Sequence, residues 1–227
     1  MTPKAIFISR SRDQIGSALR QFEANGGELY AQSLITFEGV KMDEFSSCEV
    51  VFFSSIRAAS FFFQDHAKPN ALFACAGAET ARKLTDQFHI ECAYIADEAG
   101  NPTQAAVEFK DWLKDRTALF PMSEQSLRTY SSLIPRQQKT ELVVYRTLPN
   151  PIVIPPCDYY VFSSPSNVHA FFEINVLPIH ARCIAWGQST ETALRGHQTP
   201  IYYSLKDGST LELDAYLQTH VFQTLEQ

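Results

Sequence analysis

The chain has 227 residues, of which 45% are hydrophobic and 19% are charged. This composition is typical of a globular protein with a sizeable core, and it argues against a disordered or fibrous chain. Acidic residues outnumber basic ones by 25 to 19, and the net charge of −6 argues against nucleic acid as a general partner, because phosphate binding needs a concentrated positive surface.

Short apolar strands and amphipathic helices alternate through the first half of the chain. A strand at residues 5–9 leads through a polar turn into a helix at residues 14–24, which stops at Asn25-Gly26-Gly27. An extended stretch follows at residues 29–37, and a strand at residues 49–54 then runs into a phenylalanine-rich helix. The further elements predicted here are strands at residues 71–76, 91–95 and 117–120 and helices at residues 80–87, 104–114 and 126–133.

The second half repeats this pattern after a connecting strand. That strand is predicted at residues 140–148, and a proline-rich run at residues 149–156 follows it. Beyond it, strands are predicted at residues 159–163, 183–186 and 201–204, with helices at residues 167–173, 190–194 and 210–217. Three strands are few for a sheet covered on both faces, so the N-terminal strand is expected to join them.

The predicted fold is therefore α/β, with two similar domains that each have a mainly parallel sheet flanked by helices. One domain is discontinuous and comprises residues 1–33 and 155–227. Residues 45–138 are expected to form the inserted α/β domain, and residues 34–44 and 139–154 the two strands of a β linker. We expect the two domains to face each other across a ligand-binding cleft.

Two motifs recur in the same order in the two halves. Phe53-Ser54-Ser55 is matched 109 residues later by Phe162-Ser163-Ser164, and each is followed by a helix that carries adjacent phenylalanines. The segment at residues 76–81 is matched 110 residues later by the segment at residues 186–191, and each leaves an apolar strand and enters a helix. Nearly equal offsets indicate a repeated unit.

Both motifs fall where a parallel strand ends and a helix begins, which is the edge at which open α/β sheets bind ligands. Hydroxyls and free N–H groups at this edge suit an anionic ligand. The alternative is that these side chains only cap their own helices. The residues concerned are Ser54, Ser55, Thr80, Ser164 and Thr190.

Cysteine and histidine give no sign of a metal centre. The five cysteines are odd in number and include no CxxC pair, and the six histidines show no metal-ligand spacing. Such cysteines are typical of small buried side chains in a reducing compartment. The apolar runs are far shorter than the roughly 20 residues of a membrane span, and the N-terminal segment does not resemble a secretory signal. We therefore expect no membrane partner and a cytoplasmic location.

Seven short motifs in a fixed order resemble those of the uroporphyrinogen-III synthase family. They are Ile8-Ser9-Arg10, Phe53-Ser54-Ser55-Ile56-Arg57-Ala58, Gly77-x-x-Thr80-Ala81, Phe120-Pro121, Val144-Tyr145-Arg146-Thr147, Ser163-Ser164-Pro165-Ser166 and Gly187-x-Ser189-Thr190-x-x-Ala193-Leu194. The resemblance spans nearly the whole chain. Ile56, Trp186 and Gln188 depart from the family's usual residues, and these departures concern turns more than chemistry.

The resemblance implies a reaction and a substrate class. The substrate would be hydroxymethylbilane, a linear tetrapyrrole with many carboxylates, and the product uroporphyrinogen III, in which ring D is inverted. Loss of the A-ring hydroxyl would give an azafulvene, and attack by the substituted D-ring carbon would give a spiro intermediate that fragments and recloses. Uncatalysed closure gives the uninverted I isomer. No cofactor and no metal are implied.

The same resemblance implies roles for named residues. Tyr145 would donate a hydrogen bond to the departing hydroxyl, although it could equally be a packing residue of its strand. The residues expected at strand ends to bind acetate and propionate groups are Arg10, Ser55, Arg57, Thr80, Ser164, Ser189 and Thr190. For Arg10 and Arg57, a solvated turn position is the alternative.

Two other classes of function stay open at this point. Two α/β domains around a hinge also describe non-catalytic small-molecule sensors, which would leave hydroxymethylbilane to close to the I isomer. A nucleotide-dependent enzyme is disfavoured, because neither GxGxxG nor GxxxxGK[ST] follows any predicted strand. We expect a monomer, since no long exposed apolar segment demands a partner.

Overall fold

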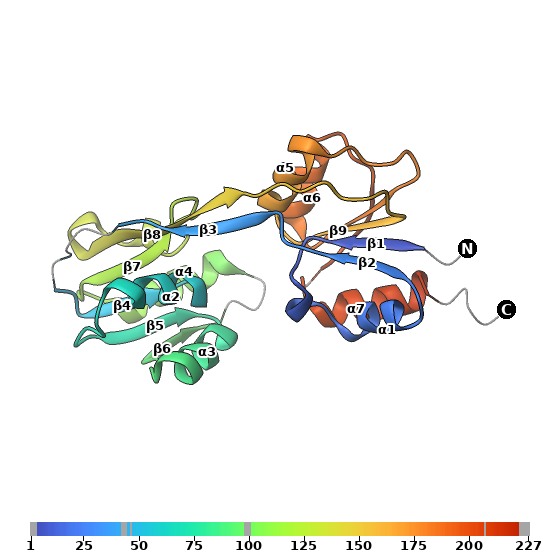
Figure 1. Cartoon of the computed structure of the whole chain (residues 1–227). Coiled ribbons are helices and arrows are strands. Elements are labelled where there is room, and N and C mark those ends of the chain that lie inside the picture. Colours follow the sequence, from blue (N-terminus) through green and yellow to red (C-terminus); the bar gives the residue numbers. More distant parts are fainter. Residues whose placement is uncertain (1–3, 42–44, 46, 98–100, 207, 223–227) are drawn as a thin grey trace. The chain divides into compact units, whose positions relative to one another are not determined.

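A computed structural model describes residues 4–41, 45, 47–97, 101–206 and 208–222. The chain divides into two compact units (Figure 1). The first unit comprises Met1–Thr36 and Leu148–Gln227, and the second comprises Phe37–Thr147. The second unit is therefore continuous in sequence, whereas the first is built from both ends of the chain.

The first unit contains a five-stranded sheet in the order β11-β10-β9-β1-β2, and all its paired strands are parallel. Its strands are β1 (Ala5–Ile8), β2 (Glu28–Ala31), β9 (Tyr159–Phe162), β10 (Arg182–Ala185) and β11 (Ile201–Ser204). Every residue of β1 and β9 is buried, as expected for central strands that are covered on both faces. The N-terminal strand β1 thus lies between β9 and β2.

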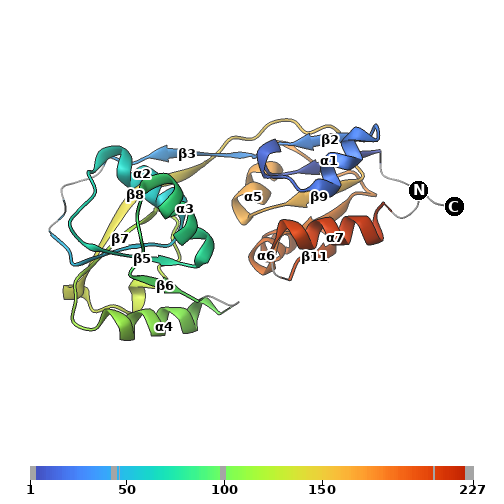
Figure 2. The same ribbon diagram turned by 90° about the horizontal axis from the view of Figure 1, so that it is seen from below.

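Helices cover both faces of this sheet (Figures 1 and 2). The helices are α1 (Ser17–Ala24), α5 (Pro165–Ile174), α6 (Gln188–Gly196) and α7 (Thr210–His220), and the short 3-10 helix η1 (Arg12–Gln14) precedes α1. Leu19 of α1 and Leu217 of α7 share one core with Ile6 and Val161. Phe171 of α5 and Leu194 of α6 share the other core.

The second unit contains a six-stranded sheet in the order β3-β8-β7-β4-β5-β6, and the pairs from β8 to β6 are parallel. Its strands are β3 (Ile35–Gly39), β4 (Val50–Phe53), β5 (Leu72–Ala76), β6 (Tyr94–Ala96), β7 (Ala118–Ser123) and β8 (Lys139–Pro149). By the unit boundaries, β3 and β8 each pass from one unit into the other. That they serve as a linker between domains stays a prediction.

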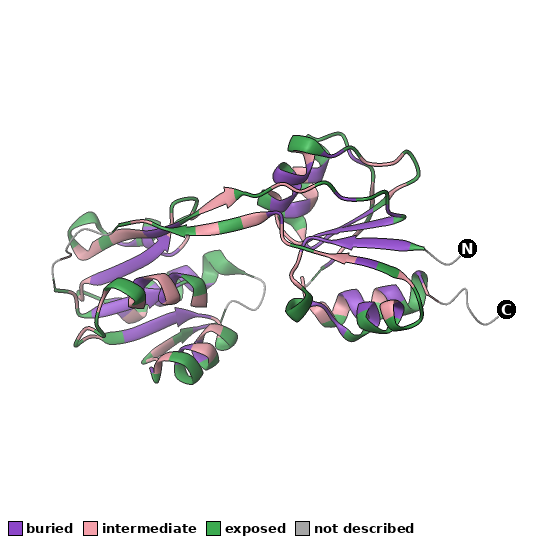
Figure 3. Ribbon diagram, in the orientation of Figure 1, coloured by how far each residue is buried: buried purple, intermediate pink, exposed green. Residues whose placement is uncertain are grey.

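The helices of the second unit also separate into two layers. They are α2 (Ile56–Asp65), α3 (Ala78–Phe88) and α4 (Pro102–Leu113), with two 3-10 turns, η2 (Ser131–Leu133) and η3 (Arg136–Gln138), after β7. Phe62 of α2 and Leu84 of α3 pack in one core, and Phe109 of α4 packs in the other. Buried residues accordingly fill most of the central strands β4, β5 and β7 and the inner sides of the helices (Figure 3).

The two sheets share one strand order. The series β2-β1-β9-β10-β11 in the first unit corresponds to β8-β7-β4-β5-β6 in the second. The predicted repeat lies at corresponding places, because Ser55 and Ser164 each cap a helix by accepting a hydrogen bond from the backbone N–H three residues later, at 3.3 Å. The α/β class with two mainly parallel, helix-flanked sheets is thereby confirmed.

Two local predictions are wrong. Residues 126–133 do not form a helix: they form turns and the 3-10 helix η2, and Arg128 adopts the left-handed conformation with φ of 55°. The extended stretch at residues 29–37 is broken, since β2 and β3 pair in different sheets. The remaining helices and strands are present, with shifts at their ends where caps and not apolar periodicity set the boundary.

Gly16 is required by a close contact before α1. Asp214 of α7 accepts hydrogen bonds from Ser17 N at 2.7 Å and Ser17 Oγ at 2.9 Å, and a Cβ on Gly16 would overlap its carboxylate. We expect Gly16→Ala to lower the free energy of unfolding by about 1–3 kcal/mol, measured by urea denaturation. Gly196→Ala, where a Cβ meets nothing within 4 Å, is the control and should cost less than about 0.5 kcal/mol. Equal effects of the two substitutions would contradict the steric argument.

Candidate active site

A polar site lies at the carboxyl ends of β4 and β7 in the second unit. From β4 the chain leads to β5 and β6 on one side, whereas β7 and β8 lie on the other side. At such a switch point the connections diverge and leave a crevice at the carboxyl edge. Ser54 follows β4 directly, and Pro121 and Met122 belong to the end of β7. The fold therefore places hydroxyl and loop groups around this edge.

A cavity of about 240 Å³ occupies this place. Its residues come from the strand ends, from the start of α4 and from the loop after β7. They are Phe52, Ser54, Pro102, Phe120, Pro121, Met122, Ser126, Leu127, Arg128, Thr129, Tyr130 and Ser131. An apolar floor and a polar rim with one guanidinium are what a small anionic ligand with an aromatic ring requires.

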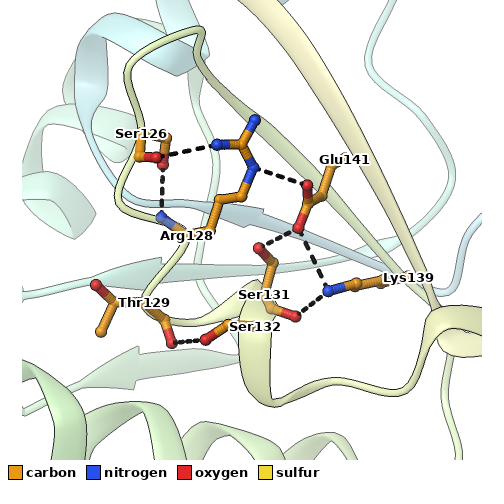
Figure 4. Close-up of polar contacts among 7 residues, drawn as sticks. All are labelled: Ser126, Arg128, Thr129, Ser131, Ser132, Lys139 and Glu141. Atoms are coloured by element: carbon orange, nitrogen blue, oxygen red, sulfur yellow. Dashed lines mark hydrogen bonds and ion pairs between the residues drawn. The ribbon is translucent and has the colours of Figure 1, made fainter.

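Arg128 is held at this cavity by the loop and by β8 (Figure 4). Its Nε donates to Glu141 Oε2 at 3.0 Å, and its Nη1 donates to the Ser126 carbonyl oxygen at 3.2 Å. Glu141 Oε1 accepts from Ser131 Oγ at 2.6 Å and lies 3.4 Å from Lys139 Nζ. Lys139 Nζ in turn donates to the Ser131 carbonyl oxygen at 2.6 Å.

This network keeps Glu141 ionised. Partial burial works against the charged form, but hydrogen bonds from Ser131 and Arg128 and the charge of Lys139 outweigh it and lower the pKa of Glu141 below its usual value of 4.5. A carboxylate whose pKa is lowered on folding stabilises the folded state above its unfolded pKa, and that stability is lost as the pH falls through the folded value.

We expect Glu141→Gln to lower the free energy of unfolding at neutral pH, and the difference from the unsubstituted chain to shrink as the pH falls below about 4.5. Urea denaturation at several pH values, followed by the fluorescence of Trp112 in the same unit, measures this. Glu91→Gln, at an exposed position of this unit, is the control. If the loss in the free energy of unfolding caused by Glu141→Gln stayed constant down to strongly acidic pH, the lowered pKa of Glu141 would be contradicted.

Across the sheet from the cavity, Phe37 brings Arg57 and Tyr145 together. The Arg57 guanidinium lies 3.6 Å from the centroid of the Phe37 ring. Tyr145 meets Phe37 edge-on at 5.9 Å and stacks on Phe61 at 5.1 Å between ring centroids. Ser55 caps α2 two residues before Arg57. Three of the predicted site residues therefore share one end of this helix and its neighbouring strand.

The phenol oxygen of Tyr145 makes no hydrogen bond to any residue that the structure describes, although the residue is only 7% exposed. Among the described residues, the enclosed polar side-chain atoms without a partner are His66 Nε2 and Asp214 Oδ1. The Tyr145 oxygen is not one of these enclosed atoms. Thr80 lies half-buried in the first turn of α3, after Gly77.

The first unit carries a corresponding edge at β1 and β9. Ser9 Oγ accepts from Ser163 N at 2.8 Å, and Ser163 Oγ donates to the Ser9 carbonyl oxygen at 2.7 Å. Asn167 donates to Ser164 Oγ at 3.0 Å and accepts from Leu34 N at 2.7 Å. These bonds fix the two strand ends against each other, and they place the predicted residue Ser164 in a cap.

Arg10 also lies at this edge, with its guanidinium 3.7 Å from the Trp186 ring. Trp186, which departs from the family's usual residue, thus packs against Arg10, an arginine predicted to bind anions. Ser189 is exposed in the first turn of α6, whereas Thr190 is only 2% exposed and offers a ligand little surface.

The sequence did not point to Ser126, Arg128, Ser131 or Glu141 as site residues. A serine-rich segment with one arginine between two strands was a signal for a ligand loop, but its apolar spacing resembled a helix. No group of three or more histidine, cysteine or acidic side chains placed to hold a metal ion occurs within the described part of the chain. None of the described helices combines the length and apolar character needed to cross a bilayer.

The structure defines an α/β protein of two doubly wound units, and each unit carries hydroxyls and an arginine packed on an aromatic ring near the carboxyl ends of its strands. The sequence model of the uroporphyrinogen-III synthase HemD family matches residues 17–207. The chain belongs to this family of enzymes of tetrapyrrole biosynthesis.

Solved structures have the same fold. The uroporphyrinogen-III synthetase from Helicobacter pylori matches with a TM-score of 0.70 at 15% sequence identity, over 95% of this chain and 99% of that one. A mutant uroporphyrinogen III synthase from the extremely thermophilic bacterium Thermus thermophilus matches with a TM-score of 0.55 at 15% identity, over the same shares. At such identity these likenesses concern the fold alone.

Proposed function

We propose that this protein cyclises hydroxymethylbilane to uroporphyrinogen III with inversion of ring D and loss of water. The observation that carries this proposal is membership of the uroporphyrinogen-III synthase HemD family over residues 17–207. The polar strand ends in both units support it, because a substrate with many carboxylates needs several separate anion-binding points.

The anion-binding groups are proposed on both units. In the second unit they are Ser55, Arg57 and Thr80, and in the first they are Arg10, Ser164, Ser189 and Thr190. The two arginines supply charge, and each is supported by an aromatic ring, Phe37 or Trp186. The hydroxyls lie in caps or first helical turns, where backbone N–H groups add donors. Thr190 contributes through its backbone, since its side chain is buried.

The chemical step needs orientation more than a strong acid or base. A thousandfold preference for the inverted closure corresponds to only about 4 kcal/mol of differential stabilisation. Holding rings A and D in one mutual pose can supply this amount. Tyr145 is proposed to donate a hydrogen bond from its phenol to the departing A-ring hydroxyl, which takes the phenol proton and leaves as water. The A-ring pyrrole N–H loses its proton as the azafulvene forms, and that proton restores the phenol. Its unpartnered phenol oxygen supports this role.

We also propose that the protein acts in the cytoplasm as a monomer. Its five cysteines are odd in number and include no CxxC pair, a pattern that suits a reducing compartment. Size-exclusion chromatography with light scattering tests the oligomeric state, and a mass of twice 25.6 kDa would overturn the monomer.

The product isomer tests the proposed reaction. The purified chain is supplied with hydroxymethylbilane made in situ by an active deaminase, and the products are oxidised to porphyrins and separated by chromatography. Isomer III in large excess over a protein-free control supports the synthase. If only isomer I forms at the control rate, the synthase proposal fails, and the alternative of a non-catalytic binding module takes its place.

A further inference from the structure

The cavity at β4 and β7 is too small for a whole linear tetrapyrrole and suits a single ring. Its volume is about 240 Å³, whereas sites for drug-sized ligands are about 300–1,000 Å³. The floor contains Phe52, Phe120 and Met122, which are 1–4% exposed. Leu127 also lines the cavity, yet it is 91% exposed. A flat ring seated here would cover this apolar side chain.

Arg128 is arranged to bind an anion at the rim of this cavity. Its Nε and Nη1 are committed to Glu141 and Ser126, and its Nη2 makes no hydrogen bond to any described residue. Figure 4 shows this third nitrogen outside the network. The Arg128 side chain remains 44% exposed despite its ion pair. The network thus orients the guanidinium and leaves its Nη2 donor available for a ligand.

The backbone at Arg128 supports a functional reason for this arrangement. Its φ of 55° is a conformation that costs a non-glycine residue about 1 kcal/mol. Such conformations persist where surrounding contacts impose them, and they cluster at ligand sites. Here the imposing contacts are the Arg128 N–H bond to Ser126 Oγ at 3.2 Å and the ion pair with Glu141.

We propose that Glu141 is a positioning residue that holds Arg128 at this cavity, where the guanidinium binds the carboxylate arm of one pyrrole ring of the substrate. The inference rests on the proposed function and extends it to residues that the sequence motifs do not include. The ring packs on the apolar floor, and Nη2 donates to the carboxylate. Lys139 and Ser131 hold Glu141 in turn.

Steady-state kinetics of isomer III formation test the proposal in the full-length protein. Arg128→Met should raise KM about tenfold, the usual result of losing one charge-assisted hydrogen bond, and should leave kcat within about twofold. Glu141→Gln should raise KM about threefold. The KM of Arg128→Lys should lie between that of Arg128→Met and that of the unsubstituted protein. In the Arg128→Met background, Glu141→Gln should add nothing, because Glu141 acts through Arg128.

Arg82→Met is the matched control, because Arg82 forms a 3.0 Å ion pair with Asp86 on an exposed face of α3 in the same unit. Its KM should be unchanged. An unchanged KM in Arg128→Met, in a protein that still makes isomer III, would overturn the carboxylate site. Independent effects of the Glu141 and Arg128 substitutions would overturn the positioning role. Neither result would touch the proposed reaction.

A binding measurement separates this proposal from the reaction. Porphobilinogen, a single pyrrole with an acetate and a propionate arm, serves as the probe and is titrated while the Arg128 Nε–H resonance is followed by NMR. A saturable shift that is weakened in Glu141→Gln supports the site even if no isomer III forms. The absence of any shift at porphobilinogen concentrations that saturate other resonances would overturn it.

Discussion

Tyr145→Phe should lower the kcat for isomer III formation on the order of 100-fold, because the departing hydroxyl loses its hydrogen-bond donor. KM should change little, since the phenol acts only as the C–O bond breaks. The ring contacts with Phe37 and Phe61 are retained, and no described residue loses a partner. Stopped assays of the III to I ratio with hydroxymethylbilane made in situ measure the effect.

Tyr30→Phe is the control, because the Tyr30 hydroxyl lies in the first unit and donates only to Glu28 Oε2 at 3.0 Å. Its kcat should match that of the unsubstituted chain. Full activity of Tyr145→Phe would show that Tyr145 is a packing residue of β8, and the proton for the departing hydroxyl would then have another source. Unchanged urea midpoints in both variants exclude a loss through unfolding.

Phe7→Ala should lower the free energy of unfolding of the first unit by about 3–5 kcal/mol. Phe7 is fully buried in β1, and its ring centroid lies 5.9 Å from that of Tyr160 and 6.0 Å from those of Phe162 and Phe171. Removing the ring leaves a cavity between β1, β9 and α5 that rigid strands cannot close. The expected loss is a large part of the stability of an ordinary domain.

The two tryptophans allow each unit to be followed separately. Trp186 lies in the first unit and Trp112 in the second. In a Trp112→Phe background, the fluorescence of Trp186 in urea should report the loss caused by Phe7→Ala. Leu211→Ala on α7, where Leu211 is 82% exposed, should change the free energy by less than about 0.5 kcal/mol. A loss below about 1 kcal/mol for Phe7→Ala would contradict the central place of β1.

Most of the fold could be predicted from the sequence, because the deciding signals are local. Four-residue apolar runs such as Val50–Phe53 and Tyr159–Phe162 became fully buried strands. Paired serines after these strands became matching helix caps in both units. In each case adjacent residues carry the signal, an apolar run or a capping serine, although the strands themselves pair with distant segments.

The loop after β7 shows why part of the site escaped prediction. Leu127, Tyr130 and Leu133 follow helical spacing, and that spacing predicted a helix at residues 126–133. In the structure Tyr130 packs in the core, whereas Leu127 is 91% exposed, so the three side chains do not share a buried face. Tertiary contacts override the helical spacing here, because Glu141 on β8 accepts hydrogen bonds from Arg128 and Ser131 and holds them in a non-helical conformation. A partner 10 or more residues away leaves no local signal.

The place of β1 in its sheet also governs the order in which the protein is completed during synthesis. β1 is the first strand made, yet its neighbour β9 ends at Phe162, so one edge of β1 has no partner until the ribosome has translated the whole second unit. Residues 37–147 are contiguous, so the second unit can fold before β9 is made and before this edge of β1 is paired. An apolar strand with an open edge is a template for pairing between chains. Nascent chains arrested before residue 159 should therefore be the aggregation-prone species, and they are the ones that a chaperone must protect.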